Sequence, residues 1–290
     1  FGFTTNQLVR NLWSRLMISG FGGKQGSLSS RSIGKQSAAD RCGSPDSLIR
    51  AIAGSDIATW LDAKDISGVA NGGAISSWTA KAGNSTGTQS TSGKRPTLDV
   101  DGFNGRPAVK FDNSNDCLQW AAEGLIDTNM PANTLIAVNT TANDGGNAML
   151  FEMGTAYQNA DNLGIYYNGV NKFVSGMGVA SGTDEDEGTS TSTCPNILNV
   201  CISTFDRSTN PNLIETYINS QKATITGAEN GNSGTNTDWE GQVSSLGSRN
   251  NGASLPFNGH IKEFIVLKRS ITEHEAFRIA VALMNKSGIT

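Results

Sequence analysis

The sequence predicts an all-β fold of the sandwich or barrel class, and three observations carry this prediction. From Trp60 onward, short strand-like runs follow one another, separated by clusters of Gly, Asn, Ser and Thr, with no helix of ordinary length between them. Asn168-Gly169 lies between two such runs, which is typical of a type I′ hairpin turn because both turn residues then adopt positive φ. In the run 198–203, apolar and polar residues alternate, which indicates a strand with one packed face and one solvent-exposed face.

A short amphipathic helix is expected first along the chain. After potential N-caps at Thr5 and Asn6, apolar residues recur at helical spacing until Gly20. They are Leu8, Val9, Leu12, Trp13, Leu16 and Met17. A helix this short cannot bury its apolar stripe alone, so it needs either the body of this protein or a neighbour in an assembly. The Gly- and Ser-rich stretch from Gly20 to Lys35 is expected to be a flexible tether.

A second short helix is expected to open at Ser44-Pro45-Asp46 and to close at Gly54, because proline suits the first helical position. The clearest strands are expected beyond it, at 108–111, 117–120, 133–140, 148–153, 163–167, 172–177, 197–205, 213–218, 222–225 and 261–267. A terminal helix follows them, with a capping box made by Ser270 and Glu273 and an end at Gly288. Its apolar stripe must lie against the outside of the sandwich and consists of Phe277, Ala280, Val281 and Met284.

Charge divides the chain into two parts. Residues 1–50 contain seven Lys or Arg and two acidic residues, a balance of +5, whereas the other 240 contain 15 basic and 24 acidic residues, a balance of −9. A basic arm suits nucleic acid or an acidic protein surface. Because aromatic residues are few and scattered there, we favour docking on protein and expect no nucleic-acid partner. We therefore predict a basic anchoring arm at 1–55 and a β domain at 56–290.

The four cysteines indicate neither a metal site nor a disulfide. Cys42, Cys117, Cys194 and Cys201 form no C-x-x-C pair, and the two histidines add no zinc-ligand spacing. The residues between Cys194 and Cys201 look extended, which would hold the two sulfurs apart. We expect four reduced thiols in a chain made in a cytosol. No run approaches the ~18 apolar residues of a membrane span, and two arginines interrupt the apolar pattern of the first twenty residues, so neither a span nor a signal peptide is expected.

Distinctive motifs lie at both ends of residues 56–290. The first end carries 60–65 (WLDAKD), 75–78 (ISSW), 95–98 (RPTL), 103–112 (FNGRPAVKFD) and 116–118 (DCL), and the far end carries 257–266 (FNGHIKEFIV) before the terminal helix. These motifs resemble laminin-G-like, concanavalin A-like jelly rolls, which recur in bacteriophage structural proteins and bacterial surface proteins. The resemblance implies a jelly-roll sandwich with a closing strand and a terminal helix. It leaves the arm unexplained.

One loop is a candidate metal site. The oxygen-bearing residues Asp112, Asn113, Asn115 and Asp116 cluster there. They would either satisfy backbone donors of a turn or hold a structural calcium ion. The spacing is not that of an EF-hand and the loop contains no glycine, so both readings stay open. No other cofactor is expected.

Catalysis is not expected. The jelly-roll fold also houses glycanases, and those of the laminarinase type resemble one another in an E-x-D-x-x-E strand that this sequence lacks. The acidic run 184–187 lies in a Ser/Thr-rich segment and is expected to be a solvated loop, with a cation or partner contact as the alternative. Glu263 lies in an expected strand without a second carboxylate, and His260 and His274 suggest no nucleophile triad.

Sugar binding is the open possibility for a site. Lectins stack aromatic rings on sugars and hydrogen-bond their hydroxyls through polar loops. The long polar loop 227–241 (GAENGNSGTNTDWEG) is the best candidate. Its Trp239 looks exposed, with Asn236 and Asp238 beside it and Tyr157 in another loop. The alternative is that these rings belong to the core or edge of a sheet.

These observations predict a non-enzymatic structural protein of a bacteriophage virion, as a decoration, fibre or tail component. The jelly roll would be displayed for host-surface carbohydrate, and residues 1–55 would anchor copies of the chain to other virion proteins. The anchoring residues would be Leu8, Leu12, Trp13, Arg15 and Leu16. The alternatives are a carbohydrate-binding module of a bacterial surface protein and a degenerate glycoside hydrolase.

Overall fold

A computed structural model describes residues 43–122, 124–126, 131–140, 145–154, 162–178, 185–194, 198–209, 213–226, 239 and 243–290. The chain divides into two units, Phe1–Cys42 and Gly43–Thr290. The predicted arm helix, with Leu8, Leu12, Trp13, Arg15 and Leu16, lies outside the described residues. Within the described residues, no helix has the length and apolar character needed to cross a membrane.

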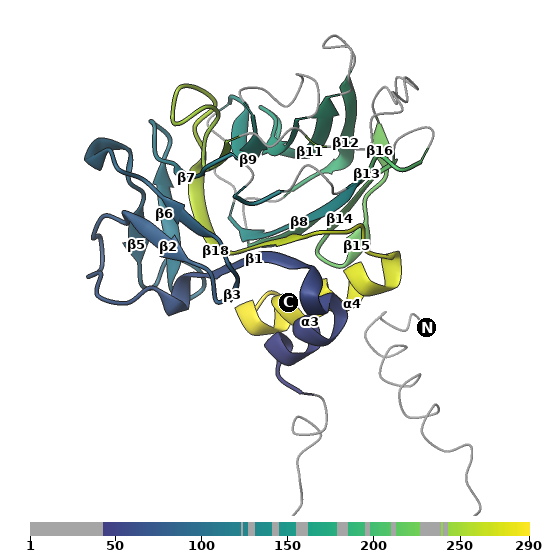
Figure 1. The fold of residues 1–290 in the computed structure, drawn as a ribbon, viewed down its shortest axis with the longest axis horizontal. Coiled ribbons are helices and arrows are strands. Elements are labelled where there is room, and N and C mark those ends of the chain that lie inside the picture. Colours follow the sequence, from purple (N-terminus) through teal and green to yellow (C-terminus); the bar gives the residue numbers. More distant parts are fainter. Residues whose placement is uncertain are drawn as a thin grey trace, which may run out of the picture. The chain divides into compact units, whose positions relative to one another are not determined.

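Two antiparallel sheets form a sandwich in the second unit (Figure 1). Sheet A runs in the order β15-β14-β13-β8-β18-β1-β3, with β6 beside β18 and β5 beside β6. Its strands are β1 (Ile57–Asp62), β3 (Ala82–Gly83), β5 (Thr97–Asp99), β6 (Ala108–Asp112), β8 (Ala132–Asn139), β13 (Asn199–Asp206), β14 (Leu213–Ile218), β15 (Gln221–Lys222) and β18 (Asn258–Leu267). The predicted all-β sandwich is therefore confirmed.

Sheet B runs in the order β16-β12-β11-β10-β9-β17-β7-β4-β2. Its strands are β2 (Ser77–Thr79), β4 (Thr86–Thr88), β7 (Leu118–Trp120), β9 (Ala148–Met153), β10 (Leu163–Tyr167), β11 (Lys172–Gly178), β12 (Glu185–Thr193), β16 (Ile225–Thr226) and β17 (Ser244–Leu246). Short 3₁₀ turns occupy Gly54–Asp56, Ala63–Asp65 and Ser92–Lys94. The inner faces of the two sheets bury one apolar core, in which the rings of Phe151 and Phe264 lie 5.1 Å apart.

Two helices cover the outer face of sheet A, α3 (Pro45–Ala53) and α4 (Glu273–Ser287) (Figure 1). Ser44 caps α3 and Gly54 ends it, as predicted. Since α3 packs in the unit Gly43–Thr290, the predicted arm boundary at residue 55 falls inside this unit. Because these helices cover sheet A, one expectation is wrong. In β13 both faces are buried, so Asn199 and Ser203 do not face solvent.

The terminal helix begins later than predicted. Its capping box is made by Thr272 and Glu275, instead of Ser270 and Glu273. This start places a different stripe against sheet A, namely Ala276, Ile279, Ala280, Ala282 and Leu283. Phe277, which we expected to be packed, is 47% exposed. Gly288 ends the helix with a φ of 70°, as predicted for a left-handed C-cap.

The predicted hairpin between β10 and β11 exists, but its turn is not type I′. Asn171 carries the positive φ of 59°, while Asn168 and Gly169 do not. The amide of Asn171 donates to the carbonyl of Asn168 at 2.9 Å, and the amide of Asn168 donates to the carbonyl of Lys172 at 3.0 Å. These bonds belong to a turn one residue longer, with Asn171 in the left-handed position that a bulged hairpin requires.

Three further sequence-based expectations were wrong. The acidic run does not form a loop over its described part, because Glu185–Thr193 is strand β12. The single strand expected at 222–225 is divided between β15 of sheet A and β16 of sheet B. The sulfurs of Cys194 and Cys201 are also not held apart. The two thiols lie beside each other and interact, although both cysteines are free.

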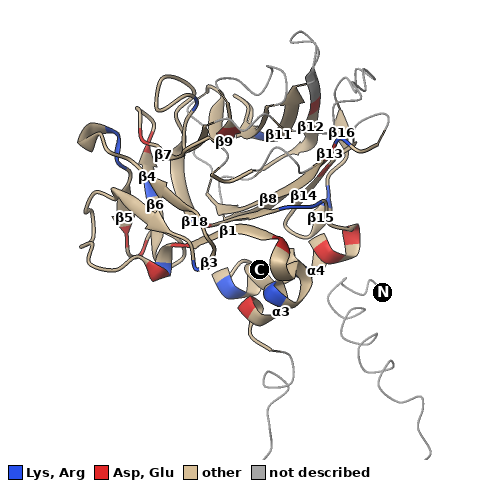
Figure 2. Cartoon of the chain, in the orientation of Figure 1, with Lys and Arg blue, Asp and Glu red and all other residues tan. Residues whose placement is uncertain are grey.

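Buried charges connect the two helices to sheet A (Figure 2). Asp62 of β1 and Glu263 of β18 are paired across the strands, and both are 0% exposed. The Nζ of Lys286, from α4, lies 2.7 Å from Asp62 and 2.8 Å from Glu263. The Nζ of Lys81 lies 3.0 Å from Asp62 and 2.6 Å from Asp46 of α3. These ion pairs hold α3, α4, β1 and β18 together.

Candidate functional site

The outer face of sheet B carries a row of polar residues. Strand register places one residue from each strand between β12 and β2 in this row, which runs Glu187, Gly176, Gly164, Glu152, Ser245, Gln119, Thr88 and Ser77. Their neighbours along each strand include Leu118, Ile165 and Leu246, which belong to the core between the sheets. Because successive side chains alternate between faces, the row points away from the core. Sheet A offers no such face, since its outer side lies under α3 and α4.

The middle of this face is covered. Glu152 is fully buried and accepts two hydrogen bonds from the Nε of Arg249, at 3.0 and 3.1 Å. The segment after Arg249 lies over β9, where the amide of Met149 donates to the carbonyl of Leu255 at 3.0 Å. Closer to β12, the hydroxyl of Tyr166 donates to Glu187 at 3.0 Å. These side chains are therefore engaged with one another across this part of the row.

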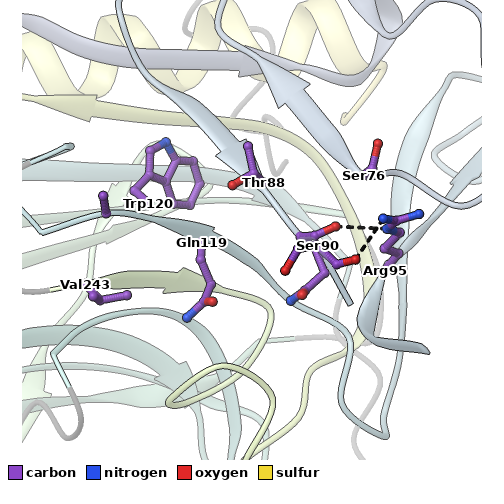
Figure 3. Close-up of a pocket in the computed structure, with 9 residues that line it drawn as sticks. Ser76, Thr88, Ser90, Arg95, Gln119, Trp120 and Val243 are labelled. Atoms are coloured by element: carbon purple, nitrogen blue, oxygen red, sulfur yellow. Dashed lines mark hydrogen bonds between the residues drawn. The ribbon is translucent and has the colours of Figure 1, made fainter. Parts of the chain in front are cut away.

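An open hollow of about 460 Å³ lies at the β4–β7 end of the same face (Figure 3). Its lining combines hydroxyl, amide and guanidinium groups with apolar surface in about equal measure. Trp120 and Val243 form one side, while Arg95, Ser90 and Ser76 lie on the other, with Gln119 between them. The full lining is Ser76, Thr88, Gln89, Ser90, Arg95, Gln119, Trp120, Ala121 and Val243.

The polar rim of the hollow is fixed by its own hydrogen bonds. Arg95 donates from Nε to the carbonyl of Gln89 at 2.9 Å and from Nη2 to the carbonyl of Ser90 at 2.9 Å. A guanidinium has five N–H donors, so these two bonds hold it in place and leave further donors for a ligand. The Gln89 amide is buried, donates to Asn251 at 3.2 Å and accepts from the amide of Thr91 at 3.0 Å. The turn carrying Arg95 is thus pre-organised.

The structure corrects the expectation of an exposed ring in the loop 227–241. Trp239 is 0% exposed and belongs to the core between the sheets. The guanidinium of Arg207 lies 4.8 Å from its ring centroid. The ring is buried and is therefore not available as a sugar platform. Its neighbours Asn236 and Asp238, and Tyr157 of the other loop, lie outside the described residues.

Sequence reasoning missed the hollow, although it selected a loop that leads to it. Val243 follows the loop 227–241 by two positions and is exposed at the edge of the hollow. The other lining residues come from two separate segments, 76–95 and 119–121. The first segment overlaps the motifs 75–78 and 95–98 of the family resemblance and the second follows the motif 116–118, but nothing in their composition marks them as a site. Only the pairing of β4 with β7 brings them together.

The candidate calcium loop is shown to contain turn chemistry. The Oδ1 of Asp112 accepts a hydrogen bond from the amide of Ser114 at 3.0 Å, and Asn113 has a φ of 64°. Asp116 is buried, and the pKa of its carboxyl is raised to about 7 by this burial and by the adjacent Asp112 carboxylate. No cluster of three or more His, Cys, Asp or Glu side chains suited to a metal occurs in the described ranges. The loop therefore places two carboxyl groups, those of Asp112 and Asp116, next to each other.

Glu263 is not a lone carboxylate, contrary to our expectation. It lies beside Asp62, but both side chains are buried beneath α4 and neutralised by lysines. A sugar cannot reach this pair. His260, a strand residue as predicted, contacts Asp99 through Nε2 at 3.0 Å. His274 lies in the first turn of α4, also as predicted.

No protein-family model matches the chain, and no curated protein matches it. Solved structures do share its fold. Trypanosoma rangeli sialidase in complex with 2,3-difluorosialic acid superposes with a TM-score of 0.55 at 14% identity, over 82% of this chain and 37% of that chain. The likeness is one of fold, that of an antiparallel β-sandwich. The same sialidase in complex with sialic acid gives a TM-score of 0.51 at 12% identity, over 81% and 34%. The sandwich therefore spans about a third of the length of these sialidases.

The CBM40 of Ruminococcus gnavus IT-sialidase, bound to α2,3-sialyllactose, is a more distant neighbour of the sandwich. It has a TM-score of 0.45 at 13% identity and covers 60% of this chain and 95% of that chain. Our expectation of a non-enzymatic protein is contradicted by these results, because the top structural neighbours are sialidases, which are enzymes. At this identity the likeness shows fold alone. The predicted virion setting finds no support among these structures.

Proposed function

We propose that this lectin-like sandwich binds carbohydrate through the hollow at the β4–β7 end of sheet B. One observation carries the proposal, namely the composition and shape of the lining. Exposed hydroxyls, a partly exposed amide and a held guanidinium surround one open space, with Val243 and Ala121 as apolar edges. Its volume of about 460 Å³ lies in the range of small-molecule sites.

The chemistry of the lining suits a polyhydroxyl ligand. Sugar hydroxyls both donate and accept hydrogen bonds, and the side chains of Ser76, Thr88 and Gln119 do the same. Arg95 is the charged residue of the described lining. Since a guanidinium pairs well with a carboxylate, we place acidic sugars first among the candidate ligands. That structures of this fold include a sialidase in complex with sialic acid supports this order of testing.

The proposal is tested with a glycan array followed by calorimetry on the hits. Thr88→Phe fills the hollow while keeping a residue that strands favour, and we expect it to weaken binding at least tenfold. Arg95→Gln should weaken acidic sugars more than neutral ones. Arg278→Gln on α4 is the matched control, because Arg278 is exposed on the opposite sheet's covering helix. Absence of any glycan ligand, or undiminished binding by Thr88→Phe, would refute the assignment.

The assembly in which this chain works is proposed from the sequence alone. The family resemblance and the +5 balance of residues 1–50 support a virion component, attached through its arm to other virion proteins in several copies. The hollow would then face the host surface. Particles assembled with and without residues 1–42 test this, since loss of the chain from the truncated particles is the expected result.

A further inference from the structure

The two sheets approach each other closely where β11 faces β13. The hydroxyls of Ser175 and Ser203, one from each sheet, lie 2.6 Å apart, and Ser175 also contacts Thr216 at 3.0 Å. Serine has one of the shortest side chains, so a direct hydroxyl contact across the core requires backbones that are near each other. Cysteine has nearly the same length. At this end of the sandwich, two facing cysteines can therefore touch.

Two cysteines occupy this position. Cys201 lies two residues before Ser203 on the same face of β13, within the core. Cys194 directly follows β12 of sheet B, where its amide donates to the carbonyl of Asn171 at 2.6 Å. The thiols of Cys194 and Cys201 lie beside each other and interact. The hydroxyl of Tyr167, from β10, lies 3.2 Å from the Sγ of Cys201 and also contacts the Cys194 thiol.

The two thiols differ in acidity. The hydrogen bond from Cys201, with further bonds from the Phe173 backbone and from Tyr167, lowers the pKa of Cys194 despite its burial. Burial raises the pKa of Cys201 well above its ordinary value. Thiolate is the form that attacks an oxidant, and a neighbouring thiol then resolves the product. Cys194 has the character of the attacking thiol and Cys201 that of the resolving thiol.

We propose that Cys194 and Cys201 form a reversible disulfide that joins sheet B to sheet A when the protein meets hydrogen peroxide. The thiolate of Cys194 attacks one peroxide oxygen, the O–O bond breaks, and the products are a sulfenic acid and, after protonation, water. The Cys201 sulfur then attacks the Cys194 sulfur, the S–O bond breaks, and the hydroxyl leaves as a second water with the Cys201 proton. Two thiols and one peroxide thus give one disulfide and two waters. A small neutral oxidant is needed because both cysteines are buried.

Peptide mapping of the full-length protein tests the proposal. Lys172 and Arg207 bound a tryptic peptide that contains both Cys194 and Cys201 and no other cysteine. After peroxide treatment and alkylation in denaturant, we expect this peptide to be unalkylated and about 2 Da lighter than the dithiol form, and to regain two alkyl groups after reduction. Cys117 should stay alkylated. A peptide that is still doubly alkylated, or that carries sulfinic acid without the lighter species, would overturn the proposal.

Variants and melting separate a native disulfide from a product of unfolding. Cys201→Ser should accumulate a sulfenic acid on Cys194, trapped by a dimedone probe, while Cys117→Ser, the matched buried thiol, should oxidise like the wild type. The wild-type map decides the matter if Cys201→Ser does not fold. We expect the oxidised protein to melt about 5 °C higher than the reduced protein. An unchanged or lower Tm would show that the bond does not fit the native packing.

Discussion

Replacing Lys286 by Met removes the cation at the centre of the charge network beneath α4. Its Nζ lies 2.7 Å from Asp46, 2.7 Å from Asp62 and 2.8 Å from Glu263. Met keeps nearly the same length and the apolar stem. The substitution therefore tests the charge and leaves the packing of the helix against sheet A largely intact.

The expected loss of stability for Lys286→Met follows from a count of the charges in the network. Three carboxylates, Asp46, Asp62 and Glu263, face three ammonium groups, Lys81, Lys262 and Lys286. At the exposed edge of the network, Lys64 and Asp65 add one charge of each sign, so the balance is unchanged. Without Lys286 the cluster carries one uncompensated negative charge, and two of its carboxylates are 0% exposed. Removing one partner of a buried ion pair costs about 3–5 kcal/mol. Since Lys64, Lys81 and Lys262 remain close, we expect a loss of about 3 kcal/mol, or a Tm lower by roughly 6–12 °C.

Urea unfolding at pH 7 measures this loss, with Lys268→Met as the control. Lys268 is exposed immediately after β18, so its substitution should change the free energy of unfolding by no more than about 0.5 kcal/mol. Adding Glu263→Gln to Lys286→Met removes the excess charge and should recover part of the loss, as a double-mutant cycle reveals. A loss below about 1 kcal/mol for Lys286→Met would refute the reasoning, because the network would then contribute specificity without net stability.

Four further predictions concern other parts of the molecule. Burial opposes ionisation of Asp46, but hydrogen bonds from Lys286 and Lys81 outweigh it and lower the pKa of this carboxyl to about 2. The stabilising contribution of the carboxylate should therefore be present above about pH 4 and be lost as pH falls towards 2. Acid unfolding of Asp46→Asn beside the wild type measures this contribution, and identical curves would contradict it. For Asp116, with its pKa raised to about 7, the sign is opposite. Wild-type stability should fall as pH rises from about 4 to 7, because the buried carboxyl must then ionise, and Asp116→Asn should remove that fall; urea unfolding over this pH range measures it. Trp239→Ala should lower the free energy of unfolding by about 3–5 kcal/mol, because it leaves a cavity in the core. An unchanged free energy in urea unfolding would instead indicate that the ring is exposed. A chain starting at Gly43 should melt within about 3 °C of the full chain, because α3 and the sandwich form one unit; a large drop would show that residues 1–42 complete its core.

Strands with a clear pattern of apolar residues were predictable from the sequence. The bounds of β9, β10 and β14 agree with the predicted ones, because each run is bordered by turn-forming residues. Strand β12 was missed because Glu185–Thr193 contains only acidic residues, Gly, Ser and Thr, with no apolar residue to mark a packed face. It forms a strand because β11 supplies a paired edge along most of its length. Tertiary pairing of this kind leaves no periodic signal in the strand itself.

The site was less predictable than the fold, for a different physical reason. The loop 227–241 contains Trp239 and ends two residues before Val243 of the hollow. Its composition could not show which of its residues face inward. A tryptophan in a polar loop fits either an exposed platform or an anchor, and only the space between the sheets decides between the two. The thiol pair illustrates the same limit. Cys194 and Cys201 are separated by an apparently extended stretch, yet the chain passes from one sheet to the other between them.

The different coverings of the two sheets explain where a ligand can bind. Sheet A has apolar residues on its outer face, Ile136, Val138, Val200 and Ile202 among them, and it must be covered by α3 and α4 to keep them from water. Sheet B carries the polar row instead, and among the described residues no helix covers it, while the segment after Arg249 lies over its middle. Uncovered polar surface then remains at the β4–β7 end, where the strands are three residues long and the turn held by Arg95 rises beside them. The hollow is thus a direct consequence of a sheet that is polar outside, partly covered and ended by short strands.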